Sequence, residues 1–131
     1  MRRLGRWVWA LGPVALYAGL IVFASSRSSL PSLRLNDKLL HFGEYAVLAF
    51  LVNRAICLIR PGIAPRAVAV LAVVLATAFG VTDELHQRFV PGRDASVFDL
   101  LADFFGSIAG AMAYTAWAEL RGRLSRRLTT P

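Results

Sequence analysis

The chain has 131 residues, 56% of them hydrophobic, and a formal net charge of +7. A soluble domain of this size has too little interior to bury so much apolar sequence, which argues against a water-soluble fold. The basic residues lie between apolar segments and at the chain ends instead of along one helix face, which argues against a nucleic-acid partner. The composition therefore predicts an integral membrane protein.

The first apolar segment, about 7–24, carries no charge and would reach ~27 Å as a helix, close to the thickness of a bilayer. It is longer than the apolar part of a typical signal peptide, so we expect an uncleaved helix. The second segment, about 39–59, is interrupted by His41 and Glu44 near its start. Asp37 lies two residues before this segment, where the helix should begin, and is a candidate helix N-cap.

The third segment, about 67–82, is rich in alanine and valine and ends at an acidic pair. The fourth, about 97–118, carries Asp99 and Asp103 in its first two turns. Ser96 and Asp99 resemble a capping box, in which Glu or Gln is the usual partner, and this is the structural alternative for Asp99. Further along, two glycines (Gly106 and Gly110) offer a small-residue face for close helix packing, which leaves a homo-oligomer open. We therefore predict one all-α domain over 1–131, a bundle of four transmembrane helices.

The loop charges predict the orientation of this bundle. Lys and Arg are more frequent in the N-terminal tail, the loop between the second and third segments, and the C-terminal tail than in the other two loops. Basic residues accumulate on the cytoplasmic side of membrane proteins. Both termini are therefore predicted to be cytoplasmic.

All acidic residues except Glu119 then lie in the outward loops or at the adjoining helix ends. Ionisable groups at a membrane edge are costly unless they face the bundle interior or a wet cavity, so their presence favours a functional site. Within each helix the spacing of three or four residues places them on a shared face. The candidate ligand-binding residues are Lys38, His41, Glu44, Tyr45, Asp83, Glu84, Gln87, Arg93, Asp99 and Asp103.

Several of these residues also have a purely structural interpretation. His41 and Glu44 could serve only to fix helix packing through a buried hydrogen bond. Glu84 could form a local ion pair with Arg88, four residues away. Asp103 lies a full turn deeper than the capping position and needs a partner, such as Arg93, His41 or a bound proton. It is the strongest single candidate.

Three strings along the chain resemble, in order, the motifs of the VanZ-like membrane proteins. They are Asp37 to Tyr45, Asp83 to Gln87 followed by Val90 to Arg93, and Asp99 through Asp103 to Gly106; the resemblance covers about 38–113. It implies a small helical membrane domain in a bacterial inner or plasma membrane. The founding member of that family is associated with resistance to the lipoglycopeptide teicoplanin, and the resemblance itself supplies no biochemical activity.

These observations favour a binding protein of the cell envelope over an enzyme. Its partners would be membrane lipids, and Lys38 and Arg93 would hold an anionic lipid, an envelope precursor or a lipid-tailed antibiotic. Acid–base catalysis on a lipid headgroup and a purely structural polar network are the alternatives. No established nucleophile, metal or cofactor motif is present, so we expect neither metal nor cofactor, although the same carboxylates could hold a divalent cation.

Overall fold

The computed structural model describes residues 2–26, 34–93 and 95–129, and within these ranges it contains four helices and no strand. The helices are α1 (Arg2–Ser25), α2 (Arg34–Ile59), α3 (Pro65–Gln87) and α4 (Val97–Thr129). Each is long and apolar enough to cross a membrane. The predicted all-α architecture of four membrane-spanning helices is confirmed.

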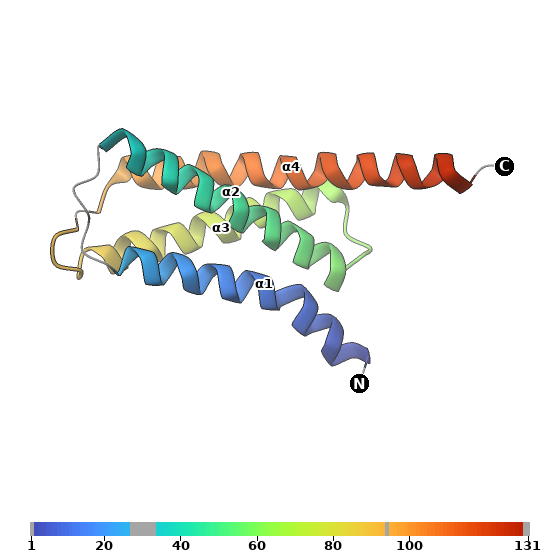
Figure 1. The fold of residues 1–131 in the computed structure, drawn as a ribbon, viewed down its shortest axis with the longest axis horizontal. Coiled ribbons are helices and arrows are strands. Elements are labelled where there is room, and N and C mark those ends of the chain that lie inside the picture. The colour runs from blue at the N-terminus through green and yellow to red at the C-terminus, as the bar shows by residue number, and fades with distance from the viewer. Residues whose placement is uncertain (1, 27–33, 94, 130–131) are drawn as a thin grey trace.

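Successive helices run in opposite directions, so the start of α1 and the end of α4 lie at the same end of the bundle (Figure 1). The other end is formed by the last turns of α1 and α3 and the first turns of α2 and α4, and we call it the polar end. α2 packs most extensively against α4, and α3 contacts both of them. The cytoplasmic location of the termini stays a prediction from the loop charges.

The helices extend beyond the apolar segments from which they were predicted. α2 begins at Arg34, so the prediction that Asp37 caps this helix is wrong: Asp37 lies in the first turn, where a carboxylate interacts favourably with the unpaired backbone N–H groups. α3 continues through its acidic residues to Gln87. α4 has 33 residues, a length of ~50 Å that exceeds the ~30 Å of the bilayer hydrocarbon. Charge limits how far a helix enters lipid, but it does not end the helix.

Two glycines of α4 allow close contact with α2. A Cβ atom on Gly106 would overlap the backbone carbonyl of Phe42, and a Cβ atom on Gly110 would overlap that of Ala46. Small residues spaced in this way let two helix backbones approach closely within lipid, where dispersion packing drives helix association. The small-residue face that left a homo-oligomer open is therefore used inside one chain.

α1 contains Pro13 and is visibly bent in Figure 1. Proline has no backbone N–H, so the carbonyl of Trp9, four residues earlier, loses its helical donor. Arg54 of α2 supplies a replacement, since its NH1 donates to the Trp9 carbonyl oxygen at 3.2 Å. The same guanidinium lies 5.2 Å from the centre of the Trp9 ring. Through these two contacts Arg54 joins α1 to α2 at Trp9.

Candidate functional site

Polar side chains from all four helices meet at the polar end. Most of the residues predicted to form a ligand site are buried there, namely His41, Tyr45, Asp83, Glu84, Gln87, Asp99 and Asp103. Lys38, Glu44 and Arg93 are half-buried. The fold thus brings side chains from separate parts of the sequence into one layer.

The centre of this layer is a hydrogen-bonded pair between α2 and α4. Asp103 is fully buried, with 0% of its surface exposed, and its Oδ1 lies 2.9 Å from Nδ1 of His41. Of the partners considered for Asp103, the structure therefore selects His41. Gly80 of α3 packs beside the pair, and a Cβ atom there would lie 2.8 Å from Oδ2 of Asp103. Only glycine at this position leaves the carboxylate its space.

Two cations, Lys38 and Arg93, lie at the more exposed edge of this layer, which we call the rim, and each faces a carboxylate. Nζ of Lys38 lies 2.7 Å from Oδ1 of Asp99, and NH1 of Arg93 lies 3.9 Å from Oδ1 of Asp37. Arg93 is positioned by a turn in which its backbone N–H donates to the carbonyl of Val90.

Gly92, with φ of +82°, adopts the left-handed conformation that the third position of a type II turn requires. Pro91 and Gly92 therefore serve a structural role, because the turn that they form directs the chain from the end of α3 back toward the polar layer.

The N-terminus of α4 is capped differently from the sequence prediction. Oγ of Ser96 accepts from the backbone N–H of Phe98, as an N-cap should. The reciprocal acceptor is not Asp99 but Glu84 of α3, whose Oε2 accepts from the Ser96 N–H at 2.8 Å. The predicted capping box is therefore wrong in its second half, because a carboxylate from a neighbouring helix replaces the local one. Nor does Glu84 form the predicted ion pair with Arg88.

This arrangement gives a testable stability difference. Ser96→Ala should destabilise the protein by about 1 kcal/mol because the Phe98 N–H loses its acceptor, whereas Ser96→Gly should cost only a few tenths. Both variants keep the backbone N–H that reaches Glu84. Reversible unfolding in mixed detergent micelles would measure both losses, and equal losses would contradict the cap.

Asp83 is satisfied by neutral donors. Its Oδ1 accepts from Oγ of Ser25 at 2.7 Å, and its Oδ2 accepts from Nε2 of Gln87 at 3.0 Å. Ser25 ends α1 and was not predicted as part of the layer. Its only signal in the sequence is its position directly after an apolar segment, which does not distinguish it from any other serine in a loop.

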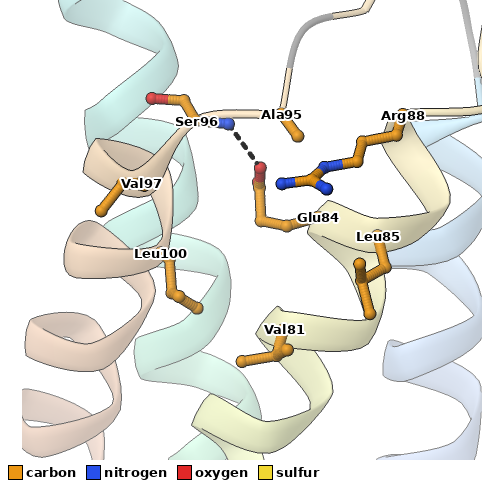
Figure 2. Close-up of a pocket in the computed structure, with 8 residues that line it drawn as sticks. All are labelled: Val81, Glu84, Leu85, Arg88, Ala95, Ser96, Val97 and Leu100. Carbon is orange, nitrogen blue, oxygen red and sulfur yellow. Dashed lines mark hydrogen bonds between the residues drawn. The ribbon is translucent and has the colours of Figure 1, made fainter.

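A groove opens beside this layer, between the last turns of α3 and the first turns of α4. It has a volume of about 140 Å³. Its apolar lining includes Val81, Leu85 and Leu100, while Glu84 and Arg88 lie toward one end (Figure 2). The Arg88 side chain is directed toward Glu84, yet no described carboxylate lies within ion-pair distance of its guanidinium. The groove therefore combines an apolar wall with an available cation.

Comparison with known sequences agrees with the motifs. The sequence model of the VanZ/LLP1 family matches residues 9–118. This chain belongs to the VanZ/LLP1 family. No curated protein and no solved structure matches it. The matched range contains every residue of the polar layer described above, whereas the last turns of α4 lie outside it.

In this VanZ/LLP1 protein, several buried polar atoms at the polar end have no hydrogen-bond partner among the described residues. They include the Tyr45 hydroxyl, Oε1 of Glu84 and Oδ2 of Asp103. Two groups of residues also bring possible metal-ligand atoms within 4.8 Å of one another: Asp37, His41 and Asp99, and His41, Glu84 and Asp103. An unpaired polar atom in a low-dielectric interior is costly, so these atoms mark positions in the layer where a further hydrogen-bonding or metal partner would be favourable.

Proposed function

We propose that this VanZ/LLP1 protein binds lipid-anchored anionic molecules at the polar end, with that end facing outward and the termini in the cytoplasm. The chemistry recognised is a phosphate attached to an acyl chain, which phospholipids and lipid-linked envelope precursors share. A lipoglycopeptide shares the acyl tail alone, so capture of such an antibiotic would use the apolar wall of the groove without the phosphate contact. The observation that carries it is the groove between α3 and α4.

The groove matches the two halves of such a ligand. Val81 and Leu85 are 41% and 48% exposed, which supports an acyl chain lying along α3 within the bilayer. Arg88 follows the last residue of α3 and would lie near headgroup level. Its guanidinium has no described ion-pair partner, so it is available to form two parallel hydrogen bonds with a phosphate.

The two cations at the rim have a second role in this proposal. Lys38 and Arg93 already face carboxylates, so Lys38 joins α2 to α4, Arg93 joins the turn after α3 to α2, and both add positive potential. Lys38 keeps 44% of its side chain exposed and retains ammonium donors for a ligand. Arg88 is therefore the first contact for the phosphate, and Lys38 and Arg93 assist it.

The test is lipid retention by purified protein. Wild type, Arg88→Ala and Arg66→Ala would be exchanged into micelles with phosphatidylglycerol or phosphatidylcholine, and native mass spectrometry would count bound lipids. Arg66 is a matched control because it is an exposed arginine at the opposite end of α3. We expect phosphatidylglycerol retention to fall several-fold in Arg88→Ala alone. An equal fall in both variants would indicate nonspecific attraction and contradict the proposal.

One observation favours a second function, acid–base chemistry on the bound headgroup. The buried His41–Asp103 pair orients an imidazole beside the layer, as general acid–base catalysis requires. Wild type and His41→Gln would be incubated with candidate lipids and the products followed by mass spectrometry. Turnover lost in folded His41→Gln would support this function, and lipid binding without turnover in wild type would exclude it for the lipids tested.

A further inference from the structure

We infer that His41, Glu84 and Asp103 form a binding site for a divalent first-row transition-metal ion, such as zinc or manganese. The three residues come from α2, α3 and α4, and one ligand atom of each lies within 4.8 Å of the other two. Bound ligands at ~2.0–2.2 Å from a metal lie at most about 4.4 Å apart, so small side-chain adjustments would close the site. This revises the expectation from sequence that no metal is involved.

The unpaired oxygens point to a cation. Glu84 is 7% exposed and Asp103 is 0% exposed, yet Oε1 of the first and Oδ2 of the second have no partner among the described residues. Both atoms are acceptors. Among the described residues the unpaired buried donors are the hydroxyls of Tyr45 and Thr77, and the Tyr45 ring lies beside Gly80 together with Asp103. One donor does not satisfy two buried carboxylates. A dication would satisfy both and would match their combined charge.

Of the two groups of possible metal ligands, the inner group (His41, Glu84 and Asp103) is favoured over the outer group (Asp37, His41 and Asp99). The reason is that the carboxylates of the outer group already have cationic partners. In the outer group, Asp99 is paired with Lys38 at 2.7 Å, and Asp37 faces Arg93 at 3.9 Å. Those two carboxylates therefore already have cationic neighbours. In the inner group, the side chain of Asp103 has the His41 ring as its one partner among the described residues, and Glu84 accepts a single hydrogen bond from a backbone N–H there.

The donor set indicates the class of metal. One imidazole nitrogen with two carboxylate oxygens suits zinc, manganese or iron, whereas magnesium and calcium prefer oxygen ligands alone. Gly80 contributes by leaving space beside Asp103, since a Cβ atom there would lie 2.8 Å from Oδ2. The site does not depend on the proposed lipid binding, because none of the three residues needs a lipid to complete the cluster.

The test is metal binding by untagged protein in micelles without anionic lipid, with zinc as the probe. Zinc content after dialysis would be measured by elemental mass spectrometry, and affinity by competition with a chelator. We expect close to one zinc per chain in wild type, and affinity reduced at least tenfold in Glu84→Gln. That variant keeps an acceptor for the Ser96 N–H, so α4 remains capped.

Asp83→Asn is the matched control, because it also neutralises a buried acid of α3, but one whose oxygens are already satisfied. It should bind zinc like wild type, as should Arg88→Ala, which separates this test from that of lipid binding. Cobalt added to wild type should give visible absorption bands of a nitrogen- and oxygen-ligated ion, a readout that needs no variant to fold. Wild type without bound zinc, or equal loss in Glu84→Gln and Asp83→Asn, would overturn the inference.

Discussion

Replacing Gly110 with alanine is expected to destabilise the bundle by about 3 kcal/mol or more, at the upper end of what overpacking costs. The new Cβ atom would overlap the backbone carbonyl of Ala46. A side chain can rotate away from such a contact, but a helix backbone cannot, so α2 and α4 would have to separate. Gly106→Ala should act in the same direction through Phe42. Reversible unfolding in mixed micelles would measure the free-energy losses.

The control for this prediction is Gly43→Ala, on the other helix of the pair. A Cβ atom on Gly43 would meet no atom within 4 Å, so this substitution should be neutral or slightly stabilising. Helix propensity favours alanine over glycine at both positions, so a loss in Gly43→Ala as large as that in Gly110→Ala would mean that contact with the facing backbone does not set the effect. Such a result would contradict the close α2–α4 approach.

Asp103→Ala is expected to cost about 3 kcal/mol, because removing one partner of a buried polar pair leaves the other unsatisfied. His41 is 5% exposed and would keep a ring nitrogen without its partner inside the buried polar layer. The same loss should not follow from Asp99→Ala, since its partner Lys38 is partly exposed and can reach water. Reversible unfolding would again give both values.

A double-mutant cycle would identify the pair as the cause. His41→Ala combined with Asp103→Ala should cost less than the two single losses added together, by about 1 kcal/mol or more, since neither residue then lacks its partner. Additive losses would show that the two side chains contribute independently. The measured coupling would also show how much of the layer is structural, separately from lipid or metal binding.

The fold could be predicted from sequence because its signals are local. Each apolar segment reports its own ability to cross a bilayer, and spacing of three or four residues reports a shared helix face. The polar layer could be predicted for the same reason, because ionisable groups at the ends of apolar helices avoid lipid by facing the bundle interior or a water-filled cavity. The residues His41 and Asp103 could be nominated individually on this basis.

The partnerships within the layer could not be predicted, because they depend on the register between helices. Ser96 and Asp99 carry a local capping signal, yet Glu84 takes the reciprocal position because α3 ends beside α4. The role of Gly80 depends on the facing position of Asp103. Ser25 likewise acquires its role only from Asp83, which is 58 residues away. The pattern of a single sequence does not show which residues so far apart along the chain will lie next to each other in the fold.

The separation of partners along the chain has a consequence for biosynthesis. His41 meets Asp103 across 62 residues, and Lys38 meets Asp99 across 61. When the ribosome has delivered only the first three helices, Lys38 and His41 lack the carboxylates that α4 supplies. The early helices are thus expected to stay beside the insertion machinery, or in contact with water, until α4 emerges. We therefore expect the polar layer of this bundle to be completed only when the last helix arrives.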